Sequence, residues 1–363
     1  MNGMATDMNG MANGMSGMTT DMSSMANDMN GMANIKYKKE INIMTTRIIG
    51  TGSYLPEMVV TNDDLAKIMD TSDEWIRTRT GIRARHLVKE ETTASMCVEA
   101  SKRALANANM QAEDIDLIIV GTITGDHVTP STACEIQAAI GAKKAVAFDI
   151  NAACSGFLFA LHTAHAFIQA GIYKNALILG AETLSKIMDW SDRSTCVLFG
   201  DGAGAAVVSA DETGLITFEQ GSDGSKGHVL ACKNRKNNNP YVTNDKEYDY
   251  VHMDGQEVYK FAVSTVPKSI QKVLDEENLT TDDITYYVLH QANIRIIQSV
   301  AKRLKVDESK FPISLDHCGN ISAASVPILL DEMNRQGMLK RGDKIIMSGF
   351  GAGLTWGTAL LEW

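Results

Sequence analysis

Residues 145–156 read AVAFDINAACSG, and this stretch decides the fold class of the chain. Its apolar beginning, residues 145–148, predicts a buried strand, and the apolar spacing over residues 157–168 predicts a helix that ends before Gly171. A strand that turns directly into a helix is typical of α/β folds. Cys154 lies in the turn, where backbone N–H groups and the positive end of the helix dipole favour a thiolate. The alternative is a free cysteine that fills a core as a small hydrophobic side chain.

Two further polar segments follow apolar runs. His290 and Asn293 close a short predicted strand, residues 287–289, and Asn320 lies in the turn HCGNIS at residues 317–322. Strand ends that open into helices are where α/β folds gather reactive groups. Taken singly, His290 reads as a structural histidine and Asn320 as a helix cap. Three such sites in one chain predict a cluster of Cys154, His290 and Asn320.

Several motifs in a fixed order extend this pattern along the chain. They are TSDEWI (71–76), RTGIR (79–83), ACSGF (153–157), FGDGAGA (199–205), HQAN (290–293), GN (319–320), SAAS (322–325), GFGAG (349–353) and TWG (355–357). In these motifs the chain, from Arg47 to Trp363, resembles the β-ketoacyl-acyl-carrier-protein synthase III family, the condensing enzymes that start fatty-acid synthesis. The third catalytic position separates relatives, since elongating synthases look like Cys–His–His and thiolases like Cys–His–Cys. Asn320 at this position indicates the type III group.

The resemblance implies an α/β fold, the duplicated, five-layered αβαβα thiolase-like fold. An internal duplication is also visible in the residues, because a helix, an acidic turn and a buried strand over residues 104–121 are echoed at 273–290. We therefore expect an N-terminal half, residues 44–215, that carries the nucleophile, and a C-terminal half, residues 216–363, that carries the histidine and the asparagine. A crevice between strand ends of the two halves is the expected pocket.

The same resemblance implies a reaction in two stages. Cys154 would take the acyl group of an acyl-CoA primer, acetyl-CoA in the simplest case, and release CoA. Malonyl-acyl-carrier protein would then lose CO2, and its enolate would attack the acyl group to give 3-oxoacyl-acyl-carrier protein. His290 and Asn320 would hydrogen-bond the malonyl thioester carbonyl, and the backbone N–H groups of Cys154 and Ala352 would bind the oxyanion. This chemistry needs neither a metal nor an organic cofactor.

Substrate contacts are likewise implied by the resemblance. Trp75 and Arg193 would sandwich the adenine of CoA, with Arg79 near its phosphates and Asn293 near the pantetheine. Thr129, the residue before a proline, would line the acyl pocket, and its small size leaves room beyond an acetyl group. Acetyl, branched and medium-chain primers all stay open.

A basic surface is predicted on the helix that follows His290. Its apolar residues fall on one side, and the docking residues implied for the acyl carrier protein are Gln291, Arg295, Lys302 and Arg303. A solvated helix face is the alternative interpretation. Attraction of an acidic carrier protein would weaken with salt.

Composition limits the remaining classes of protein. The chain has 363 residues, of which 44% are hydrophobic, without an apolar run of 18 residues, so no membrane span is expected. Six cysteines without CxxC pairing predict a reducing, cytoplasmic location. A net charge of −10 argues against nucleic-acid binding. The resemblance implies a homodimer.

The first 43 residues form a separate, Met-rich, low-complexity extension. Ten methionines at spacings of three and four, from Met1 to Met32, alternate with Asn, Gly, Ser, Thr, Ala and Asp. Because glycine disfavours a helix, we interpret the extension as a disordered repeat, or as upstream sequence before a working start at Met44. Cu(I) binding by thioethers and a Met-lined coiled coil are the other possibilities. The first basic residue is Lys36, which does not fit a targeting signal.

Two alternatives for function and one loop complete the prediction. The chain could be a specialised relative that condenses or transfers acyl groups in secondary metabolism, or a catalytically silent thioester-binding partner. Intact Cys154, His290 and Asn320 disfavour the second. The polar stretch from Gly221 to Asp254 predicts a long surface loop that could edge the substrate mouth, without residues that specify chemistry.

Overall fold

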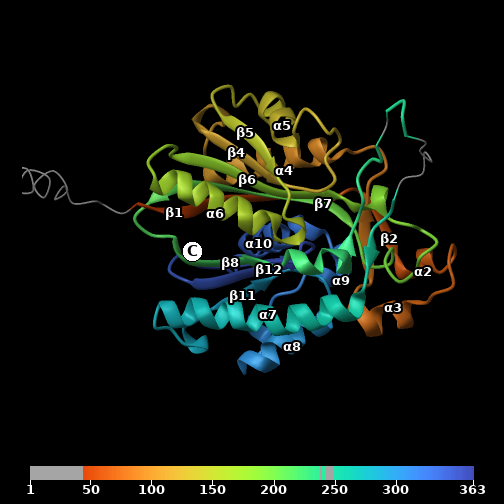
Figure 1. Ribbon diagram of the computed structural model, residues 1–363. Helices are drawn as coiled ribbons and strands as arrows, with labels where there is room; N and C mark the ends of the chain where they lie inside the picture. The colour runs from red at the N-terminus through yellow and green to blue at the C-terminus, as the bar shows by residue number, and fades with distance from the viewer. Residues whose placement is uncertain (1–43, 238, 243–248) are drawn as a thin grey trace, which may run out of the picture. The chain divides into compact units, whose positions relative to one another are not determined.

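Two mixed β-sheets organise the chain in the computed structural model, which describes residues 44–237, 239–242 and 249–363 (Figure 1). The interpretations of residues 1–43 therefore lie outside the described residues. The first sheet has the spatial order β1 (Thr45–Tyr54), β7 (Asp201–Asp211), β6 (Asn175–Thr183), β4 (Leu117–Gly121) and β5 (Val146–Ile150). The second has the order β8 (Leu215–Ser222), β13 (Thr355–Glu362), β12 (Lys344–Gly351) and β11 (Tyr286–Leu289).

These two sheets repeat one topology. In the first, β4 and β6 are parallel and β7 is antiparallel to its two neighbours; in the second, β11 and β12 are parallel and β13 is antiparallel to both of its neighbours. The helix, acidic turn and strand that the sequence repeats are α4 (Thr93–Ala108), η1 (Ala112–Asp114) and β4 in one half, and α7 (Gly255–Glu276), η5 (Thr281–Asp283) and β11 in the other. The duplicated thiolase-like α/β fold is confirmed.

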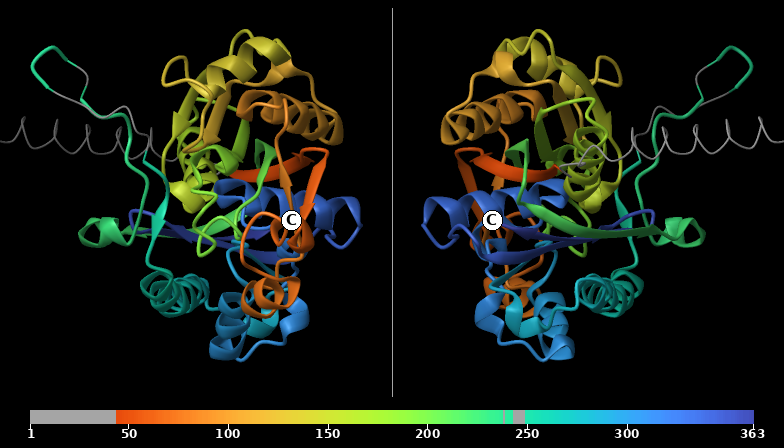
Figure 2. Two further views of the ribbon diagram at one scale, coloured as in Figure 1. Left: turned by 90° about the vertical axis from the view of Figure 1, so that its right-hand side faces the viewer. Right: turned by 90° about the vertical axis from the view of Figure 1, so that its left-hand side faces the viewer.

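Helices and sheets alternate in five layers, which Figure 2 shows from the side. One outer layer contains α4 and α5 (Thr132–Ile140), the middle layer contains α6 (Gly156–Gln169) and α10 (Ser325–Arg335), and the other outer layer contains α7 and α8 (Ile294–Leu304). Alternate side chains of a strand point to opposite faces, so both faces of a central strand must be apolar. In β4, Leu117 and Ile119 pack toward the middle layer, and Ile118 and Val120 pack toward α4.

The remaining elements are short and lie around the strand ends. They are β2 (Met58–Thr61), α2 (Asn62–Leu65), α3 (Asp73–Thr80), β3 (Ala84–Leu87), η2 (Ala153–Ser155), η3 (Leu184–Ile187), η4 (Gly224–Val229), β9 (Leu230–Ala231), β10 (His252–Met253), η6 (Glu308–Lys310), α9 (Leu315–Cys318) and η7 (Ser322–Ala324). None of the described helices is long and apolar enough to cross a bilayer. The division of the chain at residue 215, where β8 begins, stays a prediction.

Two of these short elements occupy equivalent places in the halves. The 3-10 turn η2 leads into α6, and η7 leads into α10, and each begins with a residue of positive φ: 45° at Ala153 and 44° at Ser322. Non-glycine residues rarely adopt this conformation, which costs roughly 1–3 kcal/mol and is concentrated at functional sites. The turns η2 and η7 also contact each other. The duplication therefore brings two strained turns together between the sheets.

Candidate active site

Cys154 lies in η2, between the end of β5 and the first turn of α6. The turn that joins β12 to β13 packs directly on it, because a Cβ atom added to Gly351 would lie 2.7 Å from Cys154 N. Only glycine fits there, and the close approach also brings the next residue, Ala352, beside η2. Thr355 fixes this arrangement, since its Oγ1 donates to Ala152 O at 3.2 Å. The backbone of the β12–β13 turn therefore packs closely against Cys154.

Burial dominates the electrostatics of this thiol. Desolvation raises the pKa of Cys154 to about 12, and a hydrogen bond with the Ser322 hydroxyl opposes that shift. The side chain keeps some exposure, which faces the pocket. The helix N-terminus favours a thiolate, as the sequence indicated, but lost hydration outweighs this attraction. At neutral pH the resting Cys154 side chain is therefore a protonated thiol.

His290 is the residue that directly follows β11 in the second sheet. Its backbone N–H donates to Ser348 O at 2.8 Å, and its ring meets the Phe350 ring edge-on with centroids 5.3 Å apart. The side chain is 2% exposed, and Nδ1 has no hydrogen-bond partner among the described residues. Burial lowers the pKa of His290 to about 3, so the imidazole is neutral at physiological pH. A neutral imidazole held this way can donate one N–H to a substrate.

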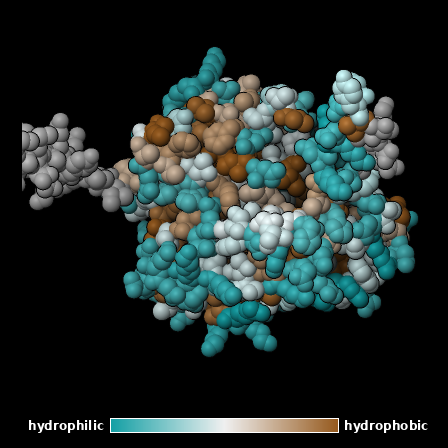
Figure 3. All heavy atoms as spheres, viewed as in Figure 1, coloured by the Kyte–Doolittle hydropathy of each residue, from teal (hydrophilic) through white to brown (hydrophobic). Residues whose placement is uncertain are grey.

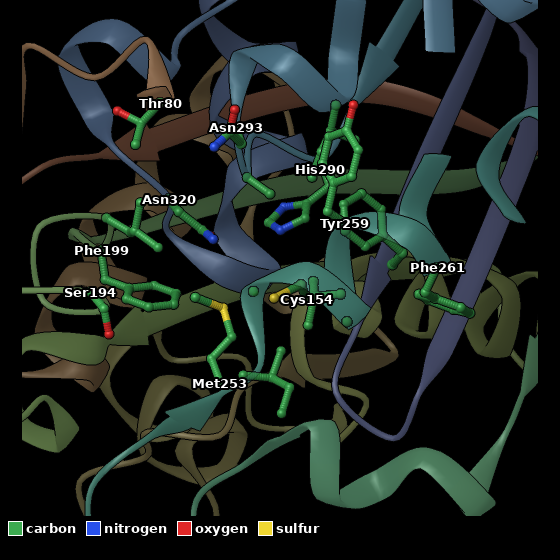
Figure 4. Close-up of a pocket in the computed structure, with 18 of the residues that line it drawn as sticks. Thr80, Cys154, Ser194, Phe199, Met253, Tyr259, Phe261, His290, Asn293 and Asn320 are labelled. Carbon is green, nitrogen blue, oxygen red and sulfur yellow. The ribbon is translucent and has the colours of Figure 1, made fainter. Parts of the chain in front are cut away.

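Asn320 is fixed by its backbone and by its own side chain. Its N–H donates to Leu198 O at 2.9 Å, and its carbonyl accepts from Gly200 N at 3.0 Å. Its Oδ1 accepts the Ser322 N–H at 2.9 Å. Because the oxygen is engaged, the Nδ2 amide group is the end presented to the pocket, as Figure 4 shows. The side chain is therefore oriented as a donor.

These three side chains meet in one pocket. Figure 4 shows the Cys154 sulfur, the His290 ring and the Asn320 amide pointing toward one another, from three segments far apart in the sequence. The pocket encloses about 240 Å³. Its other lining residues are mainly apolar: Trp75, Arg79, Thr80, Ser194, Val197, Leu198, Phe199, Leu230, Met253, Gly255, Val258, Tyr259, Phe261, Ala292, Asn293, Ile296, Phe350, Gly351 and Leu354.

The predicted CoA-binding residues gather around Trp75. The guanidinium carbon of Arg79 lies 4.7 Å from the centre of the Trp75 ring, and that of Arg193 lies 5.2 Å from it. Arg193 also pairs with Asp70 at 3.2 Å. Stacked planar groups lie about 3.5 Å apart, so an adenine between Trp75 and Arg193 would need about twice that distance between the two side chains. Adenine can therefore enter between them only if the arginine moves away. Asn293 lines the pocket and donates to Arg79 O at 3.1 Å.

Two predicted residues lie elsewhere. Thr129 is exposed and does not line the pocket of its own chain, so the single chain does not support a role in the acyl pocket. Gln291 is 1% exposed; its Nε2 donates to Leu289 O at 2.8 Å, and its Oε1 accepts from the backbone N–H groups of Ser314 and Leu315. The prediction that Gln291 contacts a carrier protein is wrong, because this amide ties the end of β11 to α9. Arg295, Lys302 and Arg303 are exposed on α8, opposite its buried apolar face.

The loop after Gly221 lies at the pocket, as the sequence suggested it could. Leu230 in β9 and Met253 in β10 line the pocket, and the two short strands pair with each other. This part of the loop therefore closes one side of the cavity with apolar side chains. That the loop specifies no chemistry stays a prediction.

A buried carboxylate that the sequence did not predict lies near Cys154. Glu182, at the end of β6, is fully buried, and its Oε2 accepts from Thr124 Oγ1 at 2.5 Å and from the Ile123 N–H at 3.2 Å. Its Oε1 accepts from Ser322 Oγ at 3.1 Å, and that hydroxyl also hydrogen-bonds the Cys154 thiol. Burial raises the pKa of Glu182 to about 7. The only sequence signal is an acidic residue at the end of an otherwise apolar strand.

Replacement of Glu182 by glutamine should change how stability depends on pH. The folded-state pKa is raised from 4.5 to about 7, so the protonated form stabilises the native state fully below pH 4.5, and this contribution disappears as the pH rises through 7. We expect the wild type to lose up to a few kcal/mol relative to Glu182→Gln between pH 5 and pH 8. Denaturant unfolding of both proteins across this range measures the difference. A constant difference would contradict the raised pKa.

Comparison with known proteins agrees with this geometry. The family model described as 3-oxoacyl-[acyl-carrier-protein (ACP)] synthase III matches residues 148–224, and the model of its C-terminal part matches residues 274–363. The β-ketoacyl-[acyl-carrier-protein] synthase III of Clostridium novyi (strain NT) is 53% identical over 319 residues, which cover 87% of this chain and 98% of the relative. The chain belongs to the β-ketoacyl-acyl-carrier-protein synthase III family.

Solved structures of this family show the same fold. The synthase III of Aquifex aeolicus VF5 superposes with a TM-score of 0.83 at 46% identity, covering 88% of this chain and all of that chain. The priming β-ketosynthase of the R1128 polyketide biosynthetic pathway also gives a TM-score of 0.83, at 37% identity, covering 88% of this chain and 96% of that chain. The family resemblance that the motifs indicated is confirmed, and with it a condensing enzyme of the acyltransferase type.

Proposed function

We propose that this synthase condenses an acyl-CoA primer, acetyl-CoA in the simplest case, with malonyl-acyl-carrier protein and so starts fatty-acid synthesis. The products are 3-oxoacyl-acyl-carrier protein, CoA and CO2. The observation that carries the proposal is the convergence of Cys154, His290 and Asn320 on one apolar pocket. The names of the relatives, which are acyl-carrier-protein synthases, support the same class of substrate.

In the first stage, Cys154 Sγ attacks the thioester carbonyl of the primer. The new C–S bond forms as the bond to CoA breaks, and the thiol proton leaves with CoA. Burial keeps Cys154 protonated at rest, so its proton is lost together with the attack. The backbone N–H groups of Cys154 and of Ala352, which follows the Gly351 packed on Cys154, are the proposed donors to the oxyanion, a contribution typically worth about 3–4 kcal/mol per donor.

In the second stage, malonyl thioester loses CO2 and its enolate attacks the acyl carbonyl on Cys154. The new C–C bond forms as the C–S bond to Cys154 breaks, and the released Cys154 thiolate takes up a proton from solvent. Negative charge develops on the malonyl thioester oxygen as CO2 leaves. His290 donates one N–H to this oxygen, and Asn320 donates an amide N–H from its fixed Nδ2. Because both donors are neutral and preorganised, they stabilise the transition state more than the substrate. Side-chain and backbone donors suffice for these steps, so the proposed reaction uses no metal or organic cofactor.

The mouth of the pocket suits the CoA part of the primer. Trp75 offers an aromatic face for adenine, with Arg193 beside it, and Arg79 offers positive charge for the phosphates. Asn293, which also lines the pocket, would contact the pantetheine. Substrate entry would move Arg193 from Trp75 to the outer face of the adenine.

A panel of acyl-CoA primers tests the function. The chain beginning at Met44 should form 3-oxoacyl-acyl-carrier protein from malonyl-acyl-carrier protein and acetyl-CoA. Product with every acyl-CoA except acetyl-CoA would instead favour a specialised priming enzyme, the alternative that likeness to the R1128 ketosynthase supports. Failure to form product from any primer would overturn the condensing function.

We also propose that the exposed face of α8 binds the carrier protein. Arg295, Lys302 and Arg303 form a basic surface on a chain whose net charge is −10, and Arg295 Nη2 donates to Thr78 O at 2.9 Å, which ties this surface to α3 and the pocket mouth. Local positive charge of this kind steers an acidic partner.

Reversal of two of these charges should weaken carrier binding. In Lys302→Glu/Arg303→Glu, KM for malonyl-acyl-carrier protein should rise about tenfold at low salt, and the difference should shrink toward 0.5 M salt, where the Debye length is only about 4 Å. Lys102→Glu, on α4 in the other outer layer, is the matched control. Steady-state kinetics at several salt concentrations measure the effect. An equal KM for mutant and wild type at low salt would show that the carrier binds elsewhere.

A homodimer in the cytoplasm fits the surface and the cysteines. Among the described residues β5 pairs only with β4, and apolar residues gather over these strands and α6, as Figure 3 shows; Val146 is 47% exposed and Val128 75%. An unpaired, apolar sheet edge is a surface that a second copy would cover. All six cysteines are free, which suits a reducing compartment. Sedimentation equilibrium should give twice the chain mass, and Val146→Lys should shift it toward the monomer.

A further inference from the structure

A second cluster of reactive side chains lies outside the pocket, between α9 and α10. His317 Nε2 and Glu332 Oε1 are 3.0 Å apart, and Cys318 Sγ lies 4.0 Å from the same Glu332 oxygen. All three ligand atoms lie within 4.8 Å of one another. We call this group the α9–α10 cluster. No step of the proposed condensation uses it.

From this arrangement we propose that the α9–α10 cluster binds a zinc ion through His317 Nε2, Cys318 Sγ and Glu332 Oε1. Zinc takes nitrogen, sulfur and carboxylate oxygen ligands at about 2.0–2.3 Å in a tetrahedron, which places ligand atoms about 3.3–3.8 Å apart. The present separations differ from these values by a few tenths of an ångström to about one ångström, within reach of side-chain rotation. A thiolate together with an imidazole selects zinc over magnesium or calcium.

Asp316 strengthens this assignment. Its Oδ1 lies 2.9 Å from His317 Nδ1, the ring nitrogen that the proposed site does not use. Histidines that bind zinc almost always donate their other N–H to a carboxylate or carbonyl, which fixes the ring and leaves the second nitrogen free for the metal. The cluster therefore has a carboxylate–histidine pair in the order that zinc sites use.

Cys318 distinguishes a metal site from a surface ion pair. His317 and its two carboxylates would make a simple ion-pair network without help from a thiol. The Cys318 side chain, however, is 2% exposed, and its sulfur contacts the Glu332 carboxylate as well as apolar neighbours. The His317 side chain is 47% exposed and that of Glu332 14%, so an ion has a path from solvent and a water can take the fourth position.

A zinc ion here would brace the segment that carries Asn320. It would join residue 318, at the end of α9, to residue 332 on α10, and so close a loop that contains Asn320 and Ser322. The backbone hydrogen bonds of Asn320 itself run to Leu198 and Gly200, which lie on a different segment from α10. Because a cross-link reduces the freedom of the segment between its ends, zinc should stabilise this turn against local unfolding. This effect does not depend on the proposed reaction.

Cobalt(II) provides the direct test, because a thiolate ligand gives a sulfur-to-cobalt charge-transfer band in the near ultraviolet. The chelator-stripped, reduced protein should bind one Co²⁺ per chain with this band and with visible bands typical of tetrahedral cobalt, and Zn²⁺ should displace it. Cys318→Ser should lose the charge-transfer band. His317→Gln and Glu332→Gln, which change more exposed residues, should lose tight binding, and Asp316→Asn should weaken it about 10–100-fold.

Two control variants separate this site from other thiols. Cys134→Ser, which removes an exposed cysteine, and Cys154→Ser, which removes the sulfur beside His290, should keep the band at full intensity. Thermal unfolding gives an independent readout: zinc should raise Tm of the wild type but not of Glu332→Gln. A stripped protein that takes up no cobalt, or a band that survives in Cys318→Ser and disappears in Cys154→Ser, would overturn the proposal.

Discussion

Cys154→Ala should abolish acyl transfer and lower kcat/KM by about 10⁴-fold or more. Losses of this size are seen when the nucleophile of a catalytic group of residues is removed. The physical reason is that Cys154 is the one thiol among the described residues that line the pocket, and the hydroxyls of Thr80, Ser194 and Tyr259 are weaker nucleophiles. Cys154→Ser should be similarly inactive, since a hydroxyl has a higher pKa than the thiol and neutral His290, with its pKa lowered to about 3, is a poor base.

Intact-protein mass spectrometry after incubation with acyl-CoA measures this directly. The wild type should gain the mass of one acyl group, and the gain should be lost in Cys154→Ala but kept in Cys134→Ser. Cys134 is exposed and does not line the pocket, so it is the matched control. An acylated Cys154→Ala protein would show that another side chain is the nucleophile.

His290→Ala and Asn320→Ala should separate the two stages of the reaction. Both side chains are proposed to donate to the malonyl thioester, so we expect decarboxylation and condensation to fall by about 10²–10³-fold while primer acylation stays within about tenfold of wild type. Release of CO2 from malonyl-carrier protein measures the second stage, and release of CoA in a single turnover measures the first. Equal losses in both stages would contradict these roles.

Asn320→Asp sharpens the same test. The aspartate keeps an oxygen that can accept the Ser322 N–H, so the side chain should keep its position. It replaces the Nδ2 donor by an anionic oxygen that repels the enolate. Condensation should therefore fall further in Asn320→Asp than in Asn320→Ala. A milder effect of aspartate would mean that Asn320 acts through position alone, not as a donor.

The three polar side chains that meet in the pocket were predictable from local patterns. Cys154 follows an apolar strand and precedes an apolar helix, and His290 and Asn320 lie at similar junctions. Such junctions are visible in a sequence because strand and helix periodicities differ and the break between them is short. The duplicated fold was predictable for the same reason, since each half repeats a helix, an acidic turn and a buried strand.

The features that the sequence did not predict depend on which side chains the fold buries. Gln291 adjoins His290 in the sequence and looks like a surface amide, yet its side chain is enclosed and bonds backbone groups that only the fold brings near it. The Cys154 thiol has the neighbours that favour a thiolate, but desolvation raises its pKa. Glu182 and the α9–α10 cluster were missed because their partners lie 14 to 140 residues apart.

The sequence by itself determined which elements form and which residues stand at their ends, because periodicity and turn chemistry act over a few residues. Only the tertiary structure decided which of those ends face one another, how far each group is removed from water, and which way each amide and hydroxyl points. Those properties depend on contacts between distant segments. They set the neutral thiol of Cys154, the neutral ring of His290 and the fixed donor of Asn320.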